Sequence, residues 1–155
     1  MRIRLLNSQM EEAVKLIWET FLQFEAPEYS EQGIASFRTF IEDPQNRACM
    51  EFFGAYEGSE LRGVLATRRD RSHICLFFVR DRYQHQGIGR MLWEYLLRHS
   101  RQDVYTVNSS PYAVPIYHKL GFVDTGREQE VDGIRFTPME FVRPERKYFQ
   151  KAERQ

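Results

Sequence analysis

Residues 84–89 (QHQGIG) form the segment of this chain best suited to bind an anion. They lie between an apolar run at residues 74–79 and an amphipathic run at residues 88–99, so we expect a turn from a strand into a helix. Such a turn exposes backbone N–H groups at the start of the helix, where the helix dipole also favours negative charge. The segment therefore predicts a site for a phosphate or pyrophosphate.

The elements around this turn follow from hydrophobic periodicity and turn residues. Apolar spacings of three and four predict two helices before residue 43, the second capped by Ser30, and a third over residues 88–99. A fourth helix begins between residues 110 and 114 and ends at Gly121. Residues 43–46 are predicted as a turn. Strands are predicted over residues 2–6, 48–56, 61–68, 73–79, 104–107, 122–131 and 134–142.

This order, β-α-α-β-β-β-α-β-α-β-β, predicts an α/β fold in which a mixed sheet carries helices on both faces. Asp132-Gly133 is a strong hairpin signal between the last two strands. The chain has 155 residues, which indicates one domain, placed at residues 1–142 and followed by a short basic tail at residues 143–155.

Composition excludes several classes of protein. Hydrophobic residues make up 42% and aromatic residues 14%, which argues against disorder. Lys plus Arg and Asp plus Glu both number 22, so no net charge draws the chain to nucleic acid or to an anionic membrane. No apolar run approaches the roughly 20 residues that span a bilayer, and no segment resembles a secretory signal. We therefore expect a cytoplasmic protein that binds neither nucleic acid nor membrane.

The two cysteines, Cys49 and Cys75, lie in apolar runs without metal-ligand spacing, so both are predicted to be reduced core residues and no metal is expected. The glycine turn also differs from two well-known phosphate loops. Arg90 stands where a Walker A loop needs lysine, and Leu92 stands where a dinucleotide-binding fingerprint needs a small residue. A turn that merely joins strand to helix is the simpler alternative.

The flanking residues favour a functional turn. Gln84-x-x-Gly87-x-Gly89 resembles motif A of the GNAT acyl-CoA N-acyltransferases. Residues 108–122 (NSSPYAVPIYHKLGF) are similar to the second half of that fold, and the resemblance covers residues 2–142. It implies a mixed, mostly antiparallel sheet of about six or seven strands with about four helices. It also implies an acyltransferase that uses acetyl-CoA as co-substrate.

The resemblance implies that the pyrophosphate lies on the N–H groups of residues 86–90, with Arg82, Arg90 or His85 as candidates for added positive charge. It further implies that the strand before the turn splays from its neighbour and pairs with the pantetheine arm, and that an N–H near Val79 holds the thioester oxygen. The implied coenzyme A contacts are Phe77, Phe78, Val79, Gln84, His85, Gln86, Gly87, Ile88, Gly89, Arg90, Asn108 and Tyr117.

Two catalytic residues are predicted. Tyr117 occupies the position of the family's general acid; tyrosine has a pKa of about 10, so it holds a proton that it can give to the departing thiolate. His73 occupies the position that corresponds to the glutamate base of the histone-acetylating branch. Glu25, Glu28 and Glu51, or water, are the alternatives for the base.

The leading hypothesis is an N-acetyltransferase that moves an acetyl group to a primary amine by direct attack in a ternary complex. The alternative is a catalytically silent module of the same fold that binds acyl-CoA or a partner. The acceptor is a small-molecule amine or a peptide or protein amine, and a homodimer is possible through the late strands. Residues 24–31 carry three carboxylates and two aromatic rings that would suit a cationic acceptor, although a solvated loop has the same composition.

Overall fold

The computed structural model describes residues 1–8 and 10–144. The predicted basic tail, from residue 145 onward, lies outside the described residues. The helices are α1 (Met10–Phe24), α2 (Glu31–Glu42), α3 (Pro44–Ala48), α4 (Ile88–Arg98) and α5 (Val114–Leu120), with single 3-10 turns at Ala26–Glu28 and Asp81–Tyr83. The strands are β1 (Arg2–Leu6), β2 (Met50–Glu57), β3 (Glu60–Arg68), β4 (His73–Val79), β5 (Val104–Ser109), β6 (Val123–Asp124), β7 (Gln129–Val131) and β8 (Ile134–Val142).

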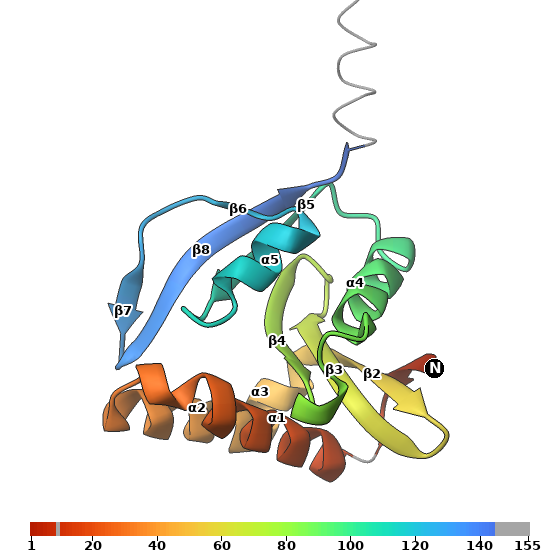
Figure 1. The fold of residues 1–155 in the computed structure, drawn as a ribbon, viewed down its shortest axis with the longest axis horizontal. Coiled ribbons are helices and arrows are strands. Elements are labelled where there is room, and N and C mark those ends of the chain that lie inside the picture. Colours follow the sequence, from red (N-terminus) through yellow and green to blue (C-terminus); the bar gives the residue numbers. More distant parts are fainter. Residues whose placement is uncertain (9, 145–155) are drawn as a thin grey trace, which may run out of the picture.

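All the strands belong to one eight-stranded mixed sheet with the order β1-β2-β3-β4-β5-β8-β6, in which β7 also pairs with β8. Every pair is antiparallel except β4 with β5. The predicted α/β class and mostly antiparallel sheet are confirmed. Helices α1 and α2 cover one face, and α4 and α5 cover the other (Figure 1).

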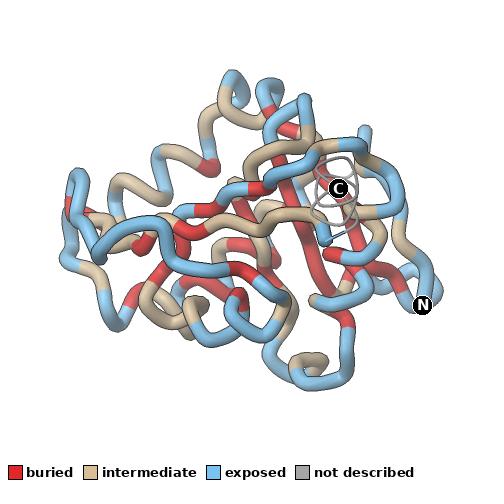
Figure 2. Tube along the Cα trace, turned by 90° about the horizontal axis from the view of Figure 1, so that it is seen from above, coloured by how far each residue is buried: buried red, intermediate tan, exposed pale blue. Residues whose placement is uncertain are grey.

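Two hydrophobic cores hold the layers together. One packs Leu16, Ile17 and Phe21 of α1 against β2, β3 and β4, and the other packs Leu92 and Trp93 of α4 against the opposite face. Figure 2 shows the buried residues along the interior strands and the exposed residues on the outer turns of the helices and loops. β4 is therefore covered on both sides, which explains its nearly continuous apolar sequence.

Three local predictions were wrong. Residues 43–46 do not form a simple turn: the Asp43 side chain accepts from Gln45 N–H at 2.8 Å and caps the short helix α3. Cys49 ends this helix and is exposed, so it is not a core residue. The predicted strand at 122–131 is interrupted, and only β6 and β7 of it pair with β8.

Candidate active site

β4 and β5 run side by side only over the first residues of β4, which pair with the middle of β5, and then separate. The parallel pairing consists of His73 with Thr106 and Ile74 with Val107. Beyond these pairs β4 continues to Val79 beside β3 alone. The separation that the family resemblance implied is present, and it leaves one edge of β4 open for an extended ligand.

A β-bulge lies at the point where the strands part. Ala66 pairs with Leu76 and Thr67 pairs with Ile74, so Cys75 is an extra residue on β4. A bulge bends its strand and increases the twist, which accounts for the divergence from β5. Apolar residues run through this stretch without Gly or Pro, so the sequence carries no signal for the bulge.

The open edge of β4 presents backbone donors. Arg80 N–H donates to Arg62 O of β3 at 2.9 Å. Because successive N–H groups of a strand point to opposite edges, the N–H groups of Val79 and Phe77 point away from β3, toward the gap. The structure thus offers donors at the place where the resemblance implies contacts with an acyl thioester.

The glycine turn has the geometry of an anion site. Gly87 caps α4 with φ of 84°, a left-handed conformation that favours glycine, and no side chain caps the helix. Met91 N–H donates to Gly87 O at 2.9 Å, so the N–H groups of Ile88, Gly89 and Arg90 precede the first intrahelical bond. These donors and the helix dipole fit a diphosphate.

A cavity of about 430 Å³ extends along this turn, and we call it the turn cavity. Its walls come from the end of β4, the start of α4 and helix α5, with Arg90 and Lys119 as cations suited to phosphate. The predicted coenzyme A contacts that line it are Phe77, Phe78, Val79, Gln84, His85, Gly87, Ile88, Gly89, Arg90 and Tyr117. Of the remaining two, Gln86 lines neither cavity described here, and Asn108 lines the second one.

The side chains of Gln84 and Arg90 form hydrogen bonds within the protein. Gln84 Nε2 donates to Val79 O at 2.9 Å, and Tyr112 Oη donates to Gln84 Oε1 at 3.3 Å. Arg90 donates to Lys119 O at 3.2 Å, which ties α4 to the end of α5. Gln84 therefore fixes the turn against β4, and the backbone of the turn is left to hold a ligand.

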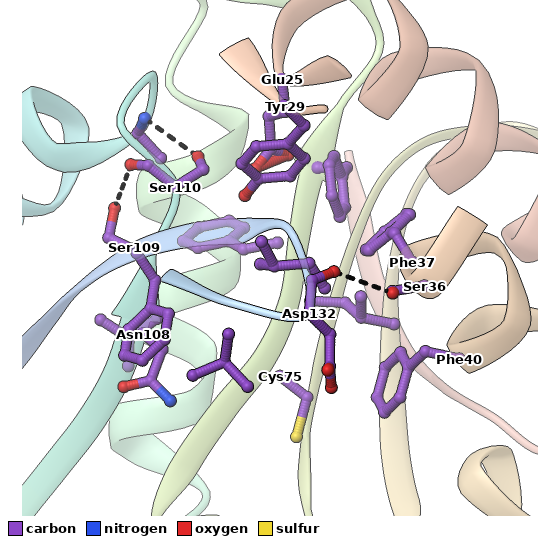
Figure 3. Close-up of a pocket in the computed structure, with 18 of the residues that line it drawn as sticks. Glu25, Tyr29, Ser36, Phe37, Phe40, Cys75, Asn108, Ser109, Ser110 and Asp132 are labelled. Carbon is purple, nitrogen blue, oxygen red and sulfur yellow. Dashed lines mark hydrogen bonds between the residues drawn. The ribbon is translucent and has the colours of Figure 1, made fainter. Parts of the chain in front are cut away.

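A second cavity of about 430 Å³ lies on the other side of the β4–β5 gap, beneath the β7–β8 hairpin; we call it the hairpin cavity. In Figure 3, Phe37 and Phe40 of α2 form one side, and Asn108 and Ser109 of β5 lie opposite. Glu25 lies beside Tyr29 at one end of the same view. Cys75, at the bulge, also lines this cavity.

The two cavities meet at a common wall. The residues that line both are Glu25, Phe77, Phe78, Ala113 and Tyr117. Glu25 follows α1 and Tyr117 belongs to α5, so elements remote in sequence bring a carboxylate and a phenol to one junction. A ligand on each side could therefore meet beside both groups.

Burial gives each of these two groups an unusual protonation behaviour. Loss of solvent raises the pKa of Glu25 from 4.5 to about 7, with a hydrogen bond from Ser110 opposing and the charge of Glu28 adding to the rise. The pKa of Tyr117, which is 5% exposed, is raised by burial and by the neighbouring Glu25 and Cys75. At neutral pH, Tyr117 holds its proton while Glu25 exchanges one, which suits an acid and a base.

The structure does not bring His73 to this junction. His73 lies at the start of β4, in the part paired with β5, where its Nδ1 is 2.7 Å from Thr106 Oγ1. Burial and the charge of Arg68 lower its pKa. Neither cavity is lined by His73, Glu28 or Glu51, and Glu51 instead pairs with Arg71 at 2.8 Å. Among the residues considered for the base, Glu25 alone lines both cavities.

Sequence reasoning overlooked the partners of Glu25. Ser110 hydrogen-bonds to the carboxylate and also accepts from Ala113 N–H at 3.2 Å, which places it in the turn before α5. α5 begins at Val114, within the range of starts predicted from the sequence, which leaves Ser110 free of the helix and able to hydrogen-bond to Glu25. The sequence signal for a special role of Glu25 is its position as an acidic residue between the apolar residues Phe24 and Ala26.

We expect Gly87→Ala to weaken binding of acetyl-CoA about tenfold, because alanine resists a φ of 84° and would turn the first N–H groups of α4. Isothermal titration calorimetry measures the dissociation constant of acetyl-CoA for each variant. Gly58→Ala is the matched control: Gly58 has φ of 59°, a Cβ at either position meets nothing within 4 Å, and Gly58 lines neither cavity. Equal losses of affinity in both variants would contradict a role for the turn.

Within residues 1–8 and 10–144, no group of three or more His, Cys, Asp or Glu side chains is arranged to hold a metal ion. In the same part of the chain, no helix is both long and apolar enough to cross a membrane.

Comparisons with known proteins agree with this geometry. The acetyltransferase (GNAT) domain family matches residues 25–143. No curated protein sequence matches the chain. A GCN5-related N-acetyltransferase structure from Rhodopseudomonas palustris is similar, with 18% identity, a TM-score of 0.77 and coverage of 92% of this chain and 95% of that one.

Two further structures share the fold. PaiA N-acetyltransferase from Thermoplasma acidophilum, solved in complex with coenzyme A, is 20% identical with a TM-score of 0.65 and coverage of 92% of this chain and 100% of that one. Apo YjaB from Escherichia coli is 21% identical with a TM-score of 0.67 and coverage of 92% and 99%. With a matched domain over most of its length and a β4 edge that opens beside a glycine turn, this chain belongs to the GNAT acetyltransferase family and is an acyl-CoA-dependent acyltransferase.

Proposed function

We propose that this enzyme transfers an acetyl group from acetyl-CoA directly to a primary amine, with Glu25 as the base and Tyr117 as the acid. One observation carries the proposal: both side chains line the turn cavity and the hairpin cavity where the two meet. The new carbon–nitrogen bond forms as the carbon–sulfur bond breaks, which yields an amide and free coenzyme A.

The turn cavity is the proposed side for acetyl-CoA, which when bound supplies an activated acyl thioester. The N–H groups of residues 86–90 would hold its diphosphate, and the open edge of β4 would pair with its pantetheine arm. The N–H of Val79 points into the gap and would stabilise negative charge on the acyl oxygen. The neighbouring structure from T. acidophilum that contains coenzyme A supports this choice of ligand.

The proton balance assigns a task to each side chain. An amine with a pKa of about 10 arrives as an ammonium ion and must lose a proton before attack. Glu25, with a pKa of about 7, is ionised often enough at neutral pH to accept that proton. Tyr117 gives its proton to the departing sulfur and recovers one from solvent, while the nitrogen releases its second proton to solvent as the amide forms and Glu25 then returns its own proton to solvent.

Direct transfer is favoured over an acyl-enzyme on Cys75. Burial raises the pKa of the Cys75 thiol to about 11, so it stays protonated at neutral pH, and the thiolate is the nucleophilic form. Initial rates with both substrates varied should accordingly follow a ternary-complex pattern.

Calorimetry with acetyl-CoA, followed by thiol release across a panel of amines, tests the proposal. We expect micromolar to submillimolar binding and turnover with at least one primary amine. Absence of acetyl-CoA binding would overturn the proposal. Tight binding without turnover on any amine would instead favour the silent module of the same fold.

A further inference from the structure

The hairpin cavity has walls suited to an apolar body. Its lining includes Phe37 and Phe40 from α2, Ile134 and Phe136 from β8, and Leu76 from β4. Its volume of about 430 Å³ lies in the range of roughly 300–1,000 Å³ typical of small-molecule sites. Aromatic walls of this kind bind flat apolar groups through burial and ring stacking.

The roof of this cavity is fixed to the opposite wall. The β7–β8 hairpin reaches the start of α2 (Figure 1), and the backbones meet so closely that a Cβ on Gly33 would clash with the carbonyl oxygen of Gly133. Ser36 Oγ donates to Asp132 O at 3.0 Å, and Tyr29 Oη donates to Arg135 O at 3.2 Å. These contacts close the space between the β7–β8 hairpin and α2, so an extended polypeptide cannot pass between them.

The charged side chains that line the hairpin cavity are all acidic. Its lining contains the carboxylates of Glu25 and Asp132, and among the described residues that line it there is no Lys, Arg or His. An acceptor amine therefore has a carboxylate partner, Glu25, at the junction, whereas an acceptor carboxylate or phosphate would be desolvated without a cation. Acceptors with an acidic group are disfavoured.

Resting on the proposed function, we infer that the acceptor is a small primary amine with an aromatic or similarly bulky apolar body and no acidic group. The amine lies at Glu25, and the apolar body lies between α2 and the β7–β8 hairpin. The lack of a cation among the described lining residues disfavours amino acids, the apolar walls disfavour the polar chain of a polyamine, and the contacts between the hairpin and α2 disfavour lysine side chains of proteins.

The experiment compares 2-phenylethylamine with L-phenylalanine, n-propylamine, spermidine and a lysine-containing peptide, by thiol release at saturating acetyl-CoA. We expect kcat/KM for 2-phenylethylamine to exceed that for L-phenylalanine at least about a hundredfold, because the two differ by the carboxylate alone. Calorimetry of 2-phenylethylamine with protein saturated with coenzyme A gives a readout independent of turnover.

Phe136→Ala locates the apolar body. Phe136 lines the hairpin cavity but belongs to neither hydrophobic core, so its truncation should spare the fold. We expect KM for 2-phenylethylamine to rise about tenfold and KM for acetyl-CoA to change less than about twofold. Val123→Ala is the matched control, since Val123 is 57% exposed, pairs with the same strand β8 and lines neither cavity. Phe136→Leu should restore much of the affinity.

The outcomes separate the two proposals. Preference for L-phenylalanine, spermidine or the peptide, or an unchanged KM in Phe136→Ala, would overturn the acceptor class while the acetyltransferase proposal stands. Failure to bind acetyl-CoA would overturn the proposed function and the acceptor class with it.

Discussion

Replacing Tyr117 by phenylalanine should lower kcat about a hundredfold or more, because the departing thiolate then has no positioned proton donor. The ring contacts with Phe77 and Phe122, at centroid distances of 6.0 and 5.3 Å, do not involve the hydroxyl and should persist. We therefore expect KM for acetyl-CoA and the melting temperature to stay close to those of the unmodified enzyme. Steady-state kinetics at varied acetyl-CoA measure kcat and KM, and thermal unfolding measures the melting temperature.

Tyr95→Phe provides the control for this prediction. Tyr95 belongs to α4, stacks on His99 with centroids 3.8 Å apart and lines neither cavity. The Tyr95→Phe substitution removes the same phenolic hydroxyl at a residue away from the junction, so kcat should change by less than about twofold. A Tyr117→Phe enzyme with full kcat would show that another group, or water, protonates the sulfur.

The Glu25→Gln substitution should change the pH profile as well as the rate. In the unmodified enzyme, kcat/KM should fall as the pH drops through about 7, because protonation of Glu25 removes the base. In Glu25→Gln, the rate at neutral pH should fall about a hundredfold or more, and log kcat/KM should then climb toward the amine pKa of about 10. Recovery at high pH is the expected signature of a missing base.

Two controls distinguish this effect from misfolding and from the other candidates. Folding raises the pKa of Glu25, so the stability that its neutral form contributes is present below about pH 4.5 and is lost as the pH rises through about 7. Glu25→Gln should therefore melt no lower than the unmodified protein at alkaline pH.

His73→Gln and Glu28→Gln, which alter residues outside both cavities, should retain activity within about threefold. A hundredfold loss in His73→Gln would favour that residue as the base instead.

The sequence by itself determined the elements whose signals are local. Alternation and apolar runs located the strands, and the stripe of Met10, Val14, Ile17, Phe21 and Phe24 located α1. Gly87 and Gly121, with φ of 84° and 103°, marked the start of α4 and the end of α5 because only glycine adopts these values readily. The glycine turn followed from the same local patterns, and the role of Tyr117 was implied by the resemblance to the GNAT family.

Local patterns failed where neighbours remote in the chain decide the outcome. Cys49 stands in an apolar run, yet the Asp43 cap and Pro44 draw it to the end of α3, where it is exposed. The bulge at Cys75 has no residue signature, because it depends on how β4 pairs with β3 and separates from β5.

The proposal of Glu25 as the base also depends on tertiary structure. The sequence favoured His73 as the base and kept Glu25 as an alternative, but β4 carries His73 into its paired end, while the chain after α1 brings Glu25 to the wall that Tyr117 also lines. The raised pKa of Glu25 exists only because packing removes water around it, with Ser110 and Glu28 as the neighbours that adjust it. Residue types and spacing thus specified the turn that can hold an anion, whereas only burial and the approach of distant elements single out the carboxylate that we propose as the base.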